Sequence, residues 1–209
     1  MTHELVLSGV NIHRQAERLL SIDAHIGPGE VLTVMGPSGS GKSTLLSYVA
    51  GLLDPAFTAA GRVLLDGRDI SGLPPEERRI GLMFQDPLLF PHLSVGSNLL
   101  FGVGRRVPER RARVRAALAA ADLVGFEDRD PATLSGGQKA RVALMRVLLS
   151  EPHALLLDEP FSKLDTALRS EIRSFVFARA RAEGLPSLLV THDPADAEAA
   201  GGPVIQLGD

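Results

Sequence analysis

The sequence contains no cysteine among its 209 residues. This absence excludes disulfide bonds and metal sites with cysteine ligands, and it is compatible with a reducing compartment. No apolar run approaches the about 18 residues that a membrane-spanning helix needs. The segment from Met1 to Val10 carries an acidic residue and lacks the basic start of a secretory signal. We therefore expect a cytoplasmic protein that reaches a membrane only through a partner.

Neither sign of charge is in strong excess, because the formal net charge is −3 and the isoelectric point is about 6.1. No overall field favours nucleic acid, so we expect no nucleic-acid partner. A local basic cluster is best explained as a solvated helix face, with a membrane surface or a partner as the alternative. This cluster consists of Arg105, Arg106, Arg110, Arg111, Arg113 and Arg115.

The pattern of apolar runs predicts an α/β fold in a single domain, residues 1–209, with no internal repeat or flexible linker. Short apolar runs predict strands over 4–7, 19–26, 31–35, 62–65, 80–84, 154–157, 187–190 and 204–207. Helical periodicity dominates from about residue 86 to 150 and returns over 166–181. We therefore expect a nucleotide-binding core formed by 1–85 and 151–209, with an inserted helical lobe over 86–150.

A glycine-rich turn follows the apolar run Val31–Met35 and precedes an apolar helix. From Gly36 to Ser43 it fits the phosphate-binding pattern G-x-x-x-x-G-K-[ST]. Glycines let the backbone N–H groups converge on a phosphate, and the helix dipole favours negative charge there. We expect Lys42 to reach the β- and γ-phosphates of a nucleotide and Ser43 to ligate Mg²⁺. The residues predicted to bind the nucleotide here are Gly36, Pro37, Ser38, Gly39, Ser40, Gly41, Lys42, Ser43 and Thr44.

Polar residues follow three other predicted strands, at Gln85, at Asp158 and Glu159, and at His192. Ligands bind at the carboxyl ends of strands in an open parallel sheet, so these residues are expected near the phosphates. We expect Asp158 to hold Mg²⁺ or one of its waters and Glu159 to deprotonate the attacking water. His192 is a candidate to contact the γ-phosphate or hold that water. The alternative for the two acids is a solvated strand-to-turn pair.

The segment Leu134–Gln138 reads LSGGQ. Ser135 and Gln138 have the spacing of a capping box at a helix start. That structural role does not require two consecutive glycines, which cost helix stability. Glycines at a helix start instead let a phosphate approach. The residues of this second predicted phosphate site are Ser135, Gly136, Gly137 and Gln138.

With these motifs in this order, the chain resembles the ATP-binding subunits of ATP-binding cassette (ABC) transporters over essentially its whole length. The resemblance implies a P-loop core with a mainly parallel sheet, an N-terminal antiparallel β subdomain and an inserted helical subdomain. It also implies a head-to-tail homodimer, in which Lys42 and Ser43 of one copy and Ser135 and Gly137 of the other bind each ATP with Mg²⁺. In that family, the position of Gln85 links Mg²⁺ and water to the transporter contact.

The run from Gln85 to Leu99 resembles the importer form of a loop that receives a permease helix, with Phe90 and Leu93 as apolar contacts. A core role for both residues is an equal alternative. The resemblance thus implies a peripheral subunit on the inner face of the cell membrane, bound to a permease. A solute-binding protein is a further implied member of the complex. Many sugar, metal-ion and anion importers of this family have a C-terminal regulatory domain, and we expect this chain to lack one.

Two features differ from the family pattern. No aromatic residue occupies Asn11–Arg14, where the family often stacks adenine, so His13 or Arg14 is expected to replace it. Lys163 replaces a small residue in the loop that ends at Asp165, a residue expected at the dimer seam.

We therefore predict an ATPase that drives solute transport, with import favoured. The alternatives are an exporter subunit, a soluble cassette ATPase of DNA repair or translation, and a non-hydrolysing regulatory cassette.

Overall fold

The computed structural model describes residues 3–208, so the outermost residues of the predicted domain, Met1, Thr2 and Asp209, lie outside the described part. Contacts within the chain divide it into two units. The sheet unit comprises Met1–Leu82, His153–Glu159 and Phe177–Asp209, and the helical unit comprises Met83–Pro152 and Pro160–Val176. Contacts therefore group residues 160–176 with the helical unit, whereas the sequence-based division assigns them to the core.

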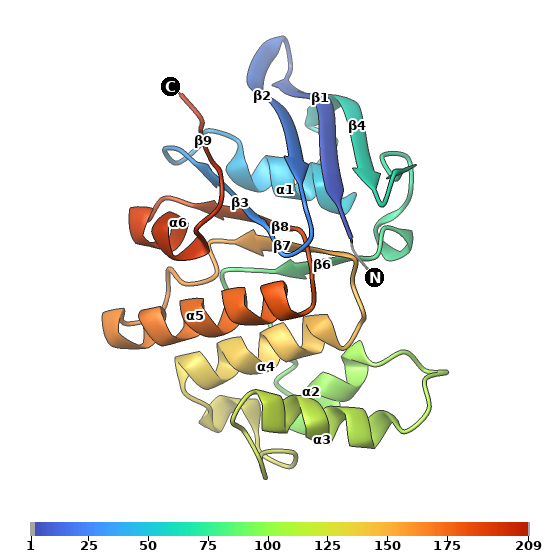
Figure 1. Cartoon of the computed structure of the whole chain (residues 1–209), viewed down its shortest axis with the longest axis vertical. Helices are drawn as coiled ribbons and strands as arrows, with labels where there is room; N and C mark the ends of the chain where they lie inside the picture. The colour runs from blue at the N-terminus through green and yellow to red at the C-terminus, as the bar shows by residue number, and fades with distance from the viewer. Residues whose placement is uncertain (1–2, 209) are drawn as a thin grey trace. The chain divides into compact units, whose positions relative to one another are not determined.

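The sheet unit contains an antiparallel and a mainly parallel sheet (Figure 1). The antiparallel order is β2 (Glu17–Ile26), β1 (Leu5–Arg14), β4 (Phe57–Leu65) and β5 (Arg68–Asp69). The second order is β6 (Ile80–Met83), β7 (Ala154–Asp158), β8 (Ser187–Thr191), β3 (Val31–Met35) and β9 (Val204–Gln206). The pairs β7–β8, β8–β3 and β3–β9 are parallel. This architecture confirms the predicted α/β fold of the P-loop ABC ATPases.

Strands β1 and β4 are longer than the sequence pattern predicts. Register shifts interrupt β1 on both of its edges, between Leu7 and Val10 toward β2 and between Ser8 and Asn11 toward β4. Gly9 lies within both intervals and has a φ of 59°. On β4, a Cβ at Gly61 would lie 2.3 Å from the Gly9 carbonyl oxygen, so the two backbones approach too closely for a side chain. The bulge shifts the alternation of apolar residues by one position and so conceals the continuation of the strand.

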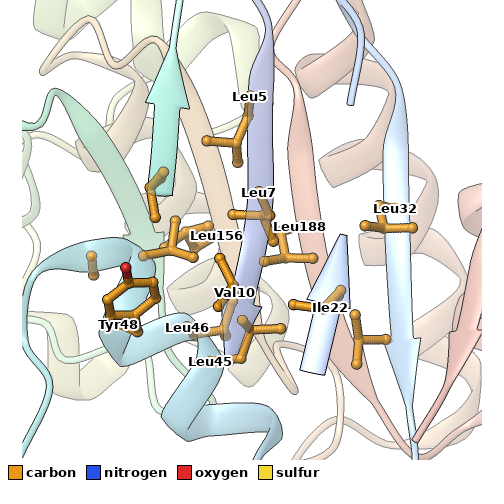
Figure 2. Close-up of a cluster of buried hydrophobic side chains, with 14 of the residues drawn as sticks. Leu5, Leu7, Val10, Ile22, Leu32, Leu45, Leu46, Tyr48, Leu156 and Leu188 are labelled. Carbon is orange, nitrogen blue, oxygen red and sulfur yellow. The ribbon is translucent and has the colours of Figure 1, made fainter. Parts of the chain in front are cut away.

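Helix α1 (Lys42–Ala50) begins at the phosphate-binding pattern and ends at Gly51, whose φ is 79°. Its Leu45 and Leu46 belong to the same hydrophobic cluster as Val10 of β1 and Leu156 of β7 (Figure 2). Leucine side chains buried this completely contribute about 1.5–3 kcal/mol each. The cluster therefore holds the start of α1, and with it the phosphate-binding turn, against the strands of the sheet unit.

Helix α6 (Pro194–Ala200) is absent from the sequence prediction, since its seven residues give no apolar period. Its start does carry a local signal: the Asp193 side chain accepts a hydrogen bond from Ala195 N at 2.9 Å, and proline occupies the first helical position. Among the described residues, no helix is both long enough and apolar enough to span a membrane.

The helical unit confirms the helical character of its segment. It contains α2 (Val95–Gly102), α3 (Arg110–Ala120), α4 (Gly136–Leu148) and the first part of α5 (Thr166–Ala182). Apolar residues from α2, α3 and α4 form one core, including Leu99, Leu118 and Val142. Most arginines of the basic cluster are exposed, as a solvated helix face requires. Arg110 differs, because it is half-buried and donates to the carbonyls of Leu100 and Val103.

Candidate functional site

The turn between β3 and α1 has the backbone of a phosphate-binding loop. Gly39 and Gly41 have φ values of 89° and 88°, which L side chains rarely adopt. A Cβ at Gly41 would also lie 2.8 Å from the side chain of Leu19. No side chain caps the start of α1, so its first N–H groups are not satisfied by a capping oxygen. Such donors, together with the helix dipole, suit a phosphate.

Lys42 is 7 % exposed and closes the loop on itself. Its Nζ donates to the carbonyl oxygens of Gly36 at 2.7 Å and Pro37 at 2.8 Å, while Ser40 N donates to Pro37 O at 3.3 Å. An ammonium has three donors, and these two bonds fix its direction while leaving one for a phosphate oxygen. Gly36 and Pro37 thus support Lys42 through their carbonyls, and the ligand roles of the loop residues stay predictions.

Ser43 and Asp158 come together although 115 residues separate them, and Ser43 Oγ donates to Asp158 Oδ1 at 3.1 Å. Two neighbouring oxygen ligands of an octahedral Mg²⁺ with bonds of 2.0–2.1 Å lie about 3 Å apart, so this pair fits the ion. Burial raises the pKa of Asp158, and the Glu159 carboxylate adds to the rise against the opposing effects of Ser43 and Lys42. A divalent cation favours the ionised carboxylate and would offset that rise.

Glu159 follows β7 in a left-handed conformation, with a φ of 44°. Its N–H donates to Val190 O on β8 at 3.0 Å, which holds this unfavourable backbone in place. Its Oε1 lies 3.2 Å from Nδ1 of His192, the residue that follows β8. The imidazole is well exposed and the Glu159 side chain only partly so. The predicted pair of acid and histidine is therefore assembled at the strand ends.

A cavity of about 380 Å³ lies between the phosphate-binding loop and Glu159, whereas Asp158 and His192 are not among its lining residues. Its predicted lining residues are Ser38, Gly39, Gly41, Lys42, Ser43, Thr44 and Glu159. Arg14 and Phe57 also line it, whereas His13 does not. Phe57 pairs with Arg14 across β1 and β4, so both side chains belong to one end of the antiparallel sheet. The sequence interpretation missed Phe57 because it placed the start of β4 five residues later.

In the helical unit, Ser135 and Gln138 form the predicted capping box at the start of α4. Ser135 N donates to Gln138 Oε1 at 3.0 Å, and Gln138 N donates to Ser135 Oγ at 3.3 Å. A Cβ at Gly137 would lie 2.7 Å from Leu168, whereas one at Gly136 would make only ordinary contact with Leu164. The close approach of Leu168 therefore explains why a glycine is needed at position 137, independently of the predicted phosphate contact.

Gln85 lies in the helical unit, where its Nε2 donates to Ser162 Oγ at 2.9 Å. The next residue on each segment pairs as well, since Lys163 Nζ lies 2.6 Å from both carboxylate oxygens of Asp86. The unusual Lys163 thus has a partner, although half-exposed ion pairs contribute little stability. Asp165 accepts from Leu168 N at 3.0 Å. The roles of Gln85 toward Mg²⁺ and of Asp165 at a dimer seam stay predictions.

Asn98 organises the segment from Gln85 to Leu99. It is fully buried, accepts from Phe90 N and donates to the carbonyls of Phe90, Leu93 and Ser94. Leu93 lines an open groove of about 880 Å³, and so does Phe101, which is 69 % exposed. Phe90 meets the ring of Phe101 edge-on at 4.8 Å. The sequence analysis did not identify Phe101 as a groove residue. It could have been found as a large apolar residue on the exposed face of α2.

Comparison with known proteins adds independent findings. The family model described as ABC transporter matches residues 19–162. An uncharacterized ABC transporter ATP-binding protein, YnjD of Escherichia coli K12, is 46 % identical over 93 % of this chain and 91 % of its own length. The thiamine import ATP-binding protein ThiQ of Cereibacter sphaeroides is 46 % identical over 88 % of this chain and 80 % of its own. An iron(III) import ATP-binding protein, FbpC 1 of Haemophilus influenzae, is 43 % identical over 90 % of this chain and 57 % of its own.

Proposed function

Because this chain belongs to the ABC transporter family, as one of its ATP-binding and ATP-hydrolysing subunits, we propose that two copies close around Mg²⁺–ATP and thereby drive solute uptake through a separate membrane permease. The observation that carries the proposal is the single cavity that the phosphate loop shares with Glu159. The names of the relatives support import, since ThiQ and FbpC 1 are import proteins. Which solute this chain serves is not part of the proposal.

The proposed chemistry assigns one task to each group. Lys42 and the N–H groups at the start of α1 bind the β- and γ-phosphates. Ser43 and Asp158 hold Mg²⁺, which when bound neutralises charge on the phosphate oxygens. Glu159 takes the proton of the attacking water at a carboxylate oxygen. His192, in contact with Glu159, fixes the direction of that carboxylate and faces the γ-phosphate.

The proposed dimer explains why one chain has two glycine-containing helix starts suited to phosphate, at Lys42 and at Ser135. Each would contribute to a different ATP, with the second copy supplying the missing half. The dependence of each site on a partner links ATP binding to closure of the dimer, and hydrolysis to its opening. By linkage, a permease that prefers one of the two states must alter the affinity for ATP to the same extent.

We further propose that Phe57 and Arg14 bind the adenine ring, in place of the aromatic residue that the family often has in the segment of His13. Both line the cavity beside the phosphate loop, and base stacking on an aromatic ring contributes about 1–3 kcal/mol. The variant Phe57→Leu keeps the apolar bulk but removes the ring face. We expect it to weaken ATP binding roughly 5- to 100-fold, without changing the affinity for tripolyphosphate, in equilibrium dialysis.

The matched control for this prediction is His13→Ala. Since His13 does not line the cavity, its loss should leave both affinities unchanged. If His13→Ala weakens ATP binding selectively and Phe57→Leu does not, the base lies on the other side of the strand and the assignment of Phe57 is wrong.

The groove of the helical unit, lined by Leu93 and Phe101, is proposed to receive the permease. Arg105 and Arg110 also line this groove, but carboxylates placed among its apolar residues would still carry a desolvation cost in any complex. We therefore expect Leu93→Asp with Phe101→Asp to release the protein from the membrane fraction of its native cells while ATP binding in solution persists. The control is Val124→Asp, another exposed apolar position of the same unit. Unchanged membrane association of the double variant would contradict the proposed groove.

A further inference from the structure

A cluster of two histidines and one aspartate lies in the sheet unit apart from the residues assigned to ATP. His3 precedes β1, Asp66 begins the turn between β4 and β5, and His153 directly precedes β7. The cluster thus lies at the start of β7, whereas Asp158, the predicted Mg²⁺ ligand, ends that strand. These side chains come from three distant parts of the sequence, so no local sequence motif predicts that they meet.

The Nδ1 atoms of both imidazoles lie close to one oxygen of the Asp66 carboxylate. His3 Nδ1 lies 2.9 Å and His153 Nδ1 lies 2.8 Å from Asp66 Oδ2. The two rings are stacked, with centroids 4.0 Å apart and an angle of 28° between their planes. All three potential ligand atoms lie within 4.8 Å of one another. Two imidazole nitrogens and one carboxylate oxygen therefore converge closely enough to be considered as ligands of one metal ion.

Backbone contacts fix the orientation of the cluster. Asp66 Oδ1 accepts from Glu4 N at 3.1 Å, and Asp66 N donates to Glu4 O at 3.0 Å. His153 N donates to Arg79 O at 2.8 Å. With its other oxygen held by the backbone, the Asp66 carboxylate can turn only Oδ2 toward the histidines. Metal ligands typically have such supporting hydrogen bonds.

The cluster is partly exposed to solvent. The side chains of His3, His153 and Asp66 are 14 %, 26 % and 33 % exposed, so the site is partly shielded but open to an ion.

We propose that His3 Nδ1, His153 Nδ1 and Asp66 Oδ2 form a binding site for a divalent first-row transition-metal ion, with Zn²⁺ as the expected occupant. Two imidazole nitrogens and one carboxylate oxygen favour such an ion over Mg²⁺ or Ca²⁺. Tetrahedral Zn²⁺ with bonds of 2.0–2.2 Å needs ligand atoms about 3.3 Å apart, so each of the two Nδ1–Oδ2 distances, 2.9 and 2.8 Å, must widen by a few tenths of an ångström. Three protein ligands leave one position for water. The ion would tie the start of β1 and the β4–β5 turn to the start of β7.

The test uses the untagged full chain after treatment with a chelator, in the absence of nucleotide. Isothermal titration with Zn²⁺ should give one site per chain, and Co²⁺ should give the visible absorption of a tetrahedral complex. We expect His3→Gln, Asp66→Asn and His153→Gln each to weaken Zn²⁺ binding at least roughly 10-fold. Zn²⁺ should raise the melting temperature of the unaltered protein but not of these variants.

Two controls separate this cluster from other places where Zn²⁺ could bind. His25→Ala removes an exposed histidine that pairs with Glu4, and Asp158→Asn removes the predicted Mg²⁺ ligand. Both should keep the tight Zn²⁺ site. Because His3 lies before the first strand, His3→Gln should still fold, which circular dichroism can verify. No tight site in the unaltered chain, or a site that survives His3→Gln, would overturn the proposal.

Discussion

Replacing Lys42 with alanine is expected to weaken ATP binding at least roughly 100-fold. A charge-assisted hydrogen bond contributes about 3 kcal/mol, which corresponds to a factor of that size. The substitution also frees the carbonyls of Gly36 and Pro37, to which Lys42 donates, so the loop loses its internal tie. Titration with ATP measures the affinity, and thermal unfolding checks that the chain remains folded.

Lys163→Ala is the matched control, since Lys163 is a half-exposed lysine paired with Asp86 in the helical unit. It should retain the ATP affinity of the unaltered chain in the absence of a second copy or permease. Equal ATP affinity of Lys42→Ala and the unaltered protein would contradict the assignment of the phosphate loop.

Glu159→Gln is expected to lower the rate of hydrolysis by roughly 10²–10⁴-fold, the contribution typical of a general base. An amide has nearly the same size as the carboxylate but cannot accept the proton of the attacking water. Because Glu159 is not among the groups assigned to bind phosphate, ATP binding should persist. Single-turnover hydrolysis and nucleotide titration together measure the two effects.

The control for this variant is Glu198→Gln, an exposed glutamate on α6. Its turnover should match that of the unaltered chain. If Glu159→Gln hydrolysed ATP at a near-normal rate, another group would have to accept the proton, and Glu159 would lose the proposed role.

The features that can be predicted from the sequence are those determined by residues close together along the chain. The phosphate loop is encoded by consecutive residues, whose glycines alone predict its backbone at Gly39 and Gly41. Asp158 and Glu159 are predictable for a different reason: a buried strand of a parallel sheet delivers its last residues to a common edge. In both cases the local sequence and one general rule about sheets are sufficient.

Features that depend on pairing between distant segments were missed. Phe57 reaches the cavity through its register with Arg14, and the bulge at Gly9 concealed the strand that sets this register. The ion pair of Asp86 with Lys163 joins residues 77 positions apart, so Lys163 stood out in the sequence only as an unexplained exception. His3, Asp66 and His153 likewise meet only in the folded sheet unit.

The central claim is that each ATP site has two halves and that only a second copy of the chain can complete it. Sedimentation of Glu159→Gln with Mg²⁺–ATP tests this claim most directly, because binding persists while hydrolysis is suppressed. We predict the mass of a dimer with ATP and that of a monomer without nucleotide. A protein that binds ATP and stays monomeric, alone and together with its membrane partner, would contradict the account.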